Sequence, residues 1–217
     1  MERATPIIDF HVHFLVRQVL EQCLPHSVAT NRGHHQLPPH LFALFEKMMT
    51  PQGAIADMDR LRIDMSVVSS ASVIAPLHWA EPSVALGLAR ELNDTAAAWA
   101  AASPRRIIGS FVLPLQDMDL ALAELHRAVA DLGLKVANVP AEVRGIYLGD
   151  ARFRPFWEAA QDLGVVTFTH PDGAKDPWFF QWGMWDTSSS SCRRRSIAQR
   201  STAHTSSSHT ERNQRMG

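Results

Sequence analysis

The chain has 217 residues, of which 46% are hydrophobic, and this length allows one domain with a substantial core. Its 21 lysine and arginine residues nearly balance 22 aspartate and glutamate residues, so no overall charge favours nucleic acid or an anionic membrane as a partner. Cys23 and Cys192 lack a CxxC spacing, which argues against a disulfide framework and favours a reducing cytoplasm. No signal peptide and no apolar run near ~20 residues is present, so we expect neither export nor membrane insertion.

The first predicted element is a strand from Ile7 to His11. It carries Asp9 and His11, the first two residues of a motif that His13 completes. Because side chains alternate along a strand, these three should share one face. Imidazole nitrogens bind zinc and similar ions well, and a nearby carboxylate can orient a ligating ring. The alternative is a pair of histidines satisfied by ordinary hydrogen bonds. We favour half of a metal site.

The segment from His13 to Pro51 is less regular, and only a short helix within Leu15–Leu24 is expected there. A long excursion after a first barrel strand fits a lid or a pocket wall. Its histidines are expected to be solvated or locally hydrogen-bonded rather than metal ligands. They are His26, His34, His35 and His40.

From residue 52 to 170, short apolar runs alternate with amphipathic stretches, which is typical of βα units in a mostly parallel sheet. Asp117 and Asp150 are predicted to cap two of the helices, and Gly133 and Gly164 to end them. The other predicted helices span Pro51–Arg62 and Pro82–Ala102, and the predicted strands are Met65–Ser69, Ile107–Leu113, Leu134–Val139 and Val165–Thr169.

His170 directly follows the fifth predicted strand. Ligands of parallel α/β folds gather at the carboxyl ends of strands, so His11, His13 and His170 are expected to converge on one metal ion. The next loop carries Asp172, a substrate-binding candidate whose alternative is a turn residue. Trp178 belongs to an aromatic cluster that would line a substrate pocket, pack a subunit interface or form apolar surface covered by a missing part of the barrel.

The composition changes after Asp186, where serine and arginine dominate. Such a segment cannot bury a core, so we predict a partial barrel domain over 1–186 and a disordered tail over 187–217. A basic, phosphorylatable tail is one interpretation, and sequence misread after a frame error is the one we favour. Binding of nucleic acid through Arg193–Arg195 is a remote third alternative.

The chain over about residues 5 to 186 resembles the amidohydrolase-related metal-dependent hydrolases and decarboxylases, a family that includes aminocarboxymuconate-semialdehyde decarboxylase and the resorcylate decarboxylases. The resemblance is carried by the motif from Ile8 to His13, by the ending Thr169-His170-Pro171, and by two supporting segments, Asp59–Asp64 and Arg144–Trp157. It implies a TIM-barrel-like fold, here incomplete with about five βα units.

The resemblance further implies one divalent metal, zinc first and manganese second, bound by His11, His13 and His170 and by an aspartate on the eighth strand. That aspartate and a catalytic histidine on the sixth strand would lie beyond Asp186, where neither is found, and the catalytic residues stay unassigned. His204 and His209 have no strand around them and are not given these roles. An arginine that helps to hold a substrate carboxylate in the decarboxylases aligns with Ala54.

We therefore expect a metal-dependent hydrolase or carboxy-lyase that acts on a small carboxylate or cyclic substrate in the cytoplasm, as a homodimer. The residues leave hydrolysis and decarboxylation open, because both begin at a metal centre that polarises an oxygen atom. The alternative is a catalytically impaired barrel fragment that binds metal weakly or needs a partner chain, since open sheet edges favour association.

Overall fold

The structure is a computed structural model, and it describes residues 5–27, 39–70 and 75–170. Met1–His170 form one compact unit. Asp172, Trp178, the domain boundary at 186 and the tail over 187–217 lie outside the described residues, so the expectations for them stay predictions. Within the described part of the chain, no helix is long and apolar enough to cross a membrane.

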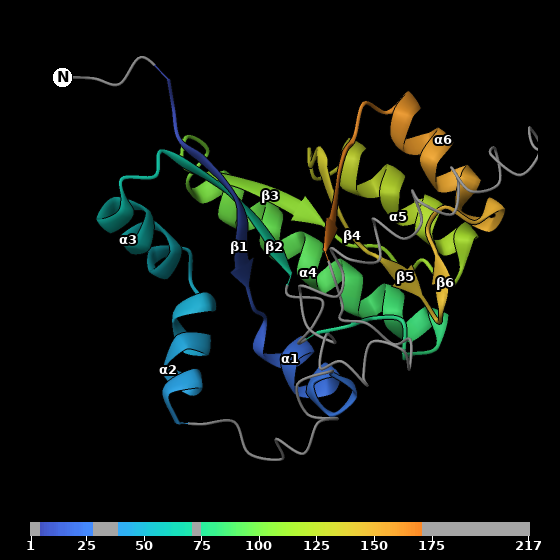
Figure 1. Ribbon diagram of the computed structural model, residues 1–217, viewed down its shortest axis with the longest axis horizontal. Coiled ribbons are helices and arrows are strands. Elements are labelled where there is room, and N and C mark those ends of the chain that lie inside the picture. Colours follow the sequence, from blue (N-terminus) through green and yellow to red (C-terminus); the bar gives the residue numbers. More distant parts are fainter. Residues whose placement is uncertain (1–4, 28–38, 71–74, 171–217) are drawn as a thin grey trace, which may run out of the picture. The chain divides into compact units, whose positions relative to one another are not determined.

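A five-stranded parallel sheet in the order β1-β2-β3-β4-β7 organises the unit (Figure 1). Parallel strands need crossover connections, and the helices between the strands provide them. The sheet is curled as in part of a TIM barrel, as predicted. Its strands are β1 (Ile8–Phe14), β2 (Met65–Ser70), β3 (Ile107–Phe111), β4 (Val136–Pro140) and β7 (Val166–His170).

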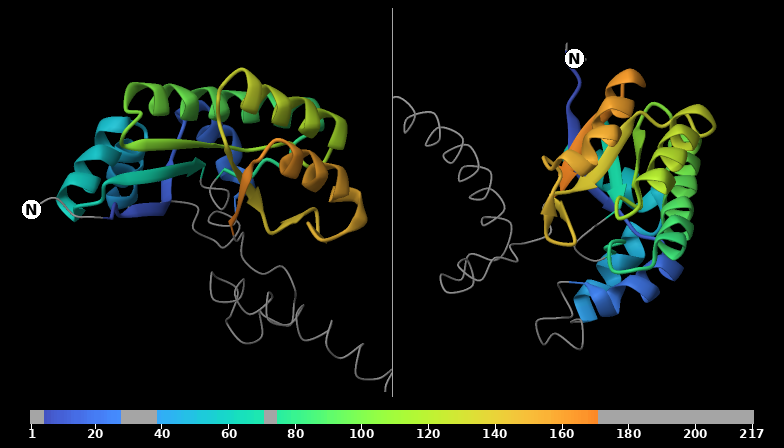
Figure 2. Two further views of the ribbon diagram at one scale, coloured as in Figure 1. Left: turned by 90° about the horizontal axis from the view of Figure 1, so that it is seen from above. Right: turned by 90° about the vertical axis from the view of Figure 1, so that its right-hand side faces the viewer.

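The long helices α4 and α5 lie side by side on one face of the sheet (Figure 2). Buried apolar residues of the sheet and of these helices form two clusters, one centred on α4 and one on α5 and α6. The helices are α1 (Arg17–Cys23), α2 (Pro39–Met48), α3 (Pro51–Leu61), α4 (Pro82–Ala102), α5 (Met118–Ala130) and α6 (Arg154–Asp162), with short 3-10 turns η1 (Leu24–His26) and η2 (Ala151–Phe153).

The predicted caps are confirmed. Asp117 accepts a hydrogen bond from the backbone N–H of Leu120 at the start of α5, and Asp150 caps η2, which runs directly into α6. Gly133 and Gly164 follow α5 and α6 with φ of 68° and 64°, a left-handed conformation that glycine adopts without strain.

Besides the 3-10 turns, a helix and a short hairpin were not among the predictions. Helix α2 occupies part of the stretch expected to be irregular, and a short antiparallel hairpin, β5 (Glu142–Val143) with β6 (Ile146–Tyr147), follows β4. The turn of the hairpin is Arg144-Gly145, with φ of 50° and 85°. From this turn, the Arg144 guanidinium donates hydrogen bonds to the carbonyls of His78 and Ala80 and so holds the loop before α4.

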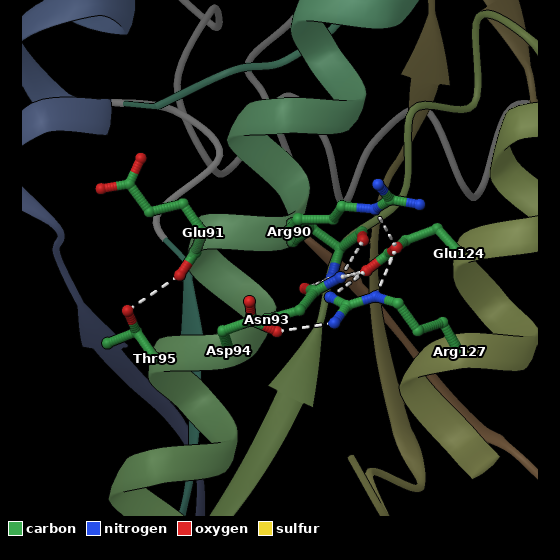
Figure 3. Close-up of polar contacts among 8 residues, drawn as sticks. Arg90, Glu91, Asn93, Asp94, Thr95, Glu124 and Arg127 are labelled. Atoms are coloured by element: carbon green, nitrogen blue, oxygen red, sulfur yellow. Dashed lines mark hydrogen bonds and ion pairs between the residues drawn. The ribbon is translucent and has the colours of Figure 1, made fainter. Parts of the chain in front are cut away.

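A buried polar network joins α4, α5 and the end of β3 (Figure 3). Glu124 is fully buried and accepts hydrogen bonds from Asn93 at 2.7 Å and from the Arg127 guanidinium at 2.8 Å. Arg90 adds a third donor at 3.2 Å. The Asn93 carboxamide also bonds both backbone groups of Val112, so this one side chain fixes the exit of β3 against the two helices.

Candidate metal centre

His11 and His13 reach the same side of β1 because the residues between and after them are held on the other side. Val12 and Phe14 pack into the core beside α4, where the rings of Phe14 and Trp99 lie 5.5 Å apart between centroids. The alternation of a strand then directs the two imidazoles to the opposite face. This part of the predicted geometry is confirmed.

Three histidine nitrogens meet at one point. The Nε2 atoms of His11 and His13 lie 3.1 Å apart, and the Nε2 atom of His170 lies 3.2 Å from that of His11 and 3.1 Å from that of His13. His170 ends β7 and is 3% exposed. Among the described residues, these histidines form a group whose side chains could together hold a metal ion.

The donor set fits a divalent cation. Ligand nitrogens about 2.0–2.1 Å from a tetrahedral zinc lie about 3.3 Å from one another, close to the observed triangle. The Nδ1 atom of His13 lies 3.4 Å from the carbonyl oxygen of Ser69 and 3.3 Å from the Ser69 hydroxyl, and these contacts orient the ring with Nε2 turned toward the other histidines. Converging lone pairs repel each other unless a cation or protons lie between them.

His13 is prepared for ligation by its surroundings. Burial and, secondarily, the positive charges that His170 and His11 carry when protonated together lower the pKa of His13 to about 4, against a smaller opposing effect of the Ser69 carbonyl. The imidazole is therefore uncharged at neutral pH without a metal present, and a metal need not displace a proton from it.

Asp9 lines the same cleft as His11 and His13, but it does not belong to the group of side chains that could hold a metal ion. Between Asp9 and Val12, β1 has one more residue than the facing segment of β2, because Asp9 pairs with Ser66 and Val12 pairs with Val68. This bulge breaks the period-two alternation. The Asp9 carboxylate instead accepts a hydrogen bond of 2.9 Å from the backbone N–H of His11 and so supports the backbone of the ligand strand.

A cleft of about 500 Å³ adjoins the histidines and is lined by β1, α2 and α3. His11 and His13 form part of its wall, and Ala54, where the decarboxylases are expected to have an arginine, forms another part. The expectation that the segment from His13 to Pro51 forms part of a pocket wall is confirmed for α2, which contributes Leu44, Phe45 and Met48. The helix itself was not predicted, although the spacing of these three residues is helical.

Comparison with protein families gives a match over most of the chain. Residues 8–205 match the family model described as Amidohydrolase. The 2-amino-3-carboxymuconate-6-semialdehyde decarboxylase of Dictyostelium discoideum is 35% identical over 121 residues, which cover 56% of this chain and 33% of that protein. The gamma-resorcylate decarboxylase of Rhodococcus jostii is 37% identical over 125 residues, which cover 52% and 37%. The matches span about a third of the length of each of these relatives.

Among solved structures, a dihydroxybenzoic acid decarboxylase from Polaromonas sp. JS666, with bound manganese and the inhibitor 2-nitroresorcinol, superposes with a TM-score of 0.67 at 26% identity. The match covers 82% of this chain and 53% of that one. The parallel sheet and its helices thus correspond to about half of the chain of a metal-containing enzyme.

Proposed function

The chain belongs to the amidohydrolase family, and we propose that it binds one divalent metal ion through His11, His13 and His170 and serves the decarboxylation of a small carboxylate. The observation that carries this proposal is the triangle of three Nε2 atoms, 3.1–3.2 Å on each side. The two decarboxylases matched in sequence favour carbon dioxide release over hydrolysis. Zinc and manganese both suit imidazole ligands, and the manganese in the Polaromonas enzyme supports manganese.

The residues present define what this part of the protein can contribute. A divalent ion bound here would supply a Lewis acid that polarises a carboxylate oxygen. The Ser69 carbonyl orients the ring of His13, the Asp9 carboxylate holds the backbone of His11, and burial of His170 keeps water from one side of the cluster. In the proposed reaction the bond between the carboxyl carbon and its neighbouring ring or chain carbon breaks. A proton adds to the ring or chain carbon, and the carboxyl group leaves as carbon dioxide.

A second candidate is a metal-binding fragment that does not turn over substrate without a partner chain. It is favoured by the two outer strands, since β1 and β7 each have a single neighbouring strand within the described residues. A homodimer and a cytoplasmic location are further predictions of the sequence.

The first test is elemental analysis of the purified full chain after reconstitution with zinc or manganese. We expect about one equivalent per chain, and loss of that metal in His170→Ala and His13→Ala. His126→Ala is the matched control, because His126 is exposed on α5 and lies outside the cluster. A chain that stays free of metal after reconstitution would refute the proposed site.

The second test separates the two candidates. The manganese-loaded chain is incubated with 2,6-dihydroxybenzoate, and carbon dioxide release is measured. Release that His170→Ala abolishes supports the decarboxylase. Stoichiometric metal without release from this or related aromatic acids supports the fragment.

A further inference from the structure

The cleft beside the histidines has a charged wall that the metal site does not explain. Its apolar lining comes mainly from α2 and α3, and includes Leu44, Phe45, Met48 and Met58. These helices lie next to the outer strand β1 (Figure 1). Lys47 and Asp57 line the same cleft and form an ion pair, with the Lys47 Nζ atom 2.6 Å from an Asp57 carboxylate oxygen.

Two cations share this one carboxylate. The same oxygen of Asp57 lies 3.3 Å from a guanidinium nitrogen of Arg60. The hydrogen bond from Lys47 and, secondarily, that from Arg60 hold the pKa of Asp57 below its usual range, so the carboxylate is charged at neutral pH. Lys47, Arg60 and Asp57 together therefore carry one net positive charge.

The other charged residue of the cleft wall is Asp9, which lines the cleft together with the histidines and hydrogen-bonds the backbone of His11. With Asp9 counted, Lys47, Arg60, Asp57 and Asp9 carry no net charge, so attraction of an anion must come from the local position of Lys47 and not from a net positive charge of the cleft.

We propose that this cleft binds a small organic anion with an apolar body, and that Lys47 binds its anionic group by exchanging Asp57 for it. Arg60 keeps Asp57 paired after the exchange, so no carboxylate is left without a counter-ion. The Lys47 side chain is 43% exposed and can turn toward the cleft at little cost in burial. The inference rests on the proposed function in taking this anion to be the substrate, but the binding step needs no metal.

The test measures binding of two probes to the full chain treated with EDTA, by ligand-observed NMR. Benzoate has the apolar body and the charge, and benzamide has nearly the same shape without the charge. Lys47→Met keeps most of the stem and removes the charge, and we expect it to weaken benzoate binding about 5-fold without changing benzamide binding. Lys47→Arg should retain most of the benzoate affinity.

Asp57→Asn gives the opposite change, which a merely structural role of the ion pair does not predict. Without its competitor, Lys47 should bind benzoate about 3-fold more tightly, again with benzamide unchanged. Asp59→Asn is the matched control, because it removes the same charge from the same helix at a residue that pairs with Arg106 and does not line the cleft. Lys135→Met controls for the loss of a lysine charge elsewhere.

Three results would overturn the inference. They are equal changes in affinity for benzoate and benzamide, a benzoate affinity that neither Lys47→Met nor Asp57→Asn changes, and no binding of benzoate at all. Failure of the proposed function looks different. If the chain binds no metal but benzoate affinity still depends on Lys47 and Asp57, the metal proposal fails and the anion site stands. If metal binds stoichiometrically and neither variant changes the affinity for benzoate, the anion site fails and the metal proposal stands.

Discussion

Burial keeps His13 of the histidine cluster neutral at pH 7, and this makes the metal-free protein sensitive to acid. The pKa of His13 is about 4 in the folded chain and near 6.5 as a free side chain. The unfolded chain therefore binds a proton between these pH values that the folded chain does not, so the stability conferred by a neutral His13 is complete above pH 6.5 and is lost as the pH falls toward 4.

We predict that the free energy of unfolding of the metal-free chain, measured with urea, falls as the pH is lowered from 6.5 to 4. His13 should contribute up to about 1.4 kcal/mol per pH unit to this fall. His13→Gln should flatten that part of the profile, whereas His126→Gln should leave it unchanged. An identical slope in wild type and His13→Gln would show that another group is responsible.

Gly53 marks a second place where a single residue limits the structure, at the corner between α2 and α3. A methyl group added there would lie 2.1 Å from the backbone oxygen of Lys47, far inside van der Waals contact. We predict that Gly53→Ala costs about 1–3 kcal/mol of unfolding free energy in urea titration, as overpacking does elsewhere.

The matched control is Gly87→Ala within α4. A Cβ at Gly87 meets nothing within 4 Å, so the change should stabilise the helix by about 0.5–1 kcal/mol. If both alanines stabilised the chain, the tight corner at Gly53 would be refuted.

At the scale of elements, the α4–α5 pair depends on one buried carboxylate. Glu124 is 0% exposed as a side chain and is neutralised by Arg127 and Arg90, whose hydrogen bonds, with that of Asn93, lower the pKa of Glu124 against the opposing effect of burial. Because three donors lose their acceptor together, we predict that Glu124→Ala costs about 3 kcal/mol.

The comparison is Glu158→Ala on α6, which removes an exposed ion pair with Arg154 at the same 2.8 Å distance. Exposed pairs contribute about 0.2–1 kcal/mol, so this variant should unfold at nearly the wild-type urea concentration. Similar losses in the two variants would mean that burial of Glu124 does not set its contribution.

Local chemistry made most elements predictable from the sequence. Asp117, Gly133 and Gly164 act within a turn of their own position, and the structure places them in the predicted roles. The bulge after Asp9 could not be predicted in this way, because it arises from the register between β1 and β2, which lie more than fifty residues apart. The hairpin at Arg144-Gly145 has strands of two residues each, too short for any periodicity to appear.

The same distinction applies to the candidate site. His11, His13 and His170 could be grouped from the sequence because parallel strands present their carboxyl ends at one edge of a sheet. Lys47 and Asp57 could not, because their pairing depends on how α2 and α3 pack against each other. The end of the sheet at which a strand residue lies follows from the predicted parallel arrangement. The walls of the cleft, in contrast, depend on how the helices pack.

At the scale of the whole sheet, the histidine cluster joins its two ends. His11 and His13 belong to β1 and His170 to β7, the first and last strands in the order β1-β2-β3-β4-β7. Three strands separate them along the sheet, yet their side chains touch because the sheet is curled. A metal ion bound by all three would therefore close a loop of interactions across the sheet and stabilise it as one unit.

We predict that manganese or zinc at about 100 times its dissociation constant raises the stability by about 2.7 kcal/mol and the melting temperature by roughly 5–10 °C. Magnesium prefers oxygen ligands and should give almost no shift. The decisive variant is His170→Ala, which leaves two ligands on β1 but removes the connection to β7. If the metal acts by joining the outer strands, this variant loses the thermal shift, and amide hydrogen exchange in β7 no longer slows when metal is added. If the metal still raised the melting temperature of His170→Ala, the ion would be bound by β1 alone. Its stabilising effect would then not come from joining β1 to β7.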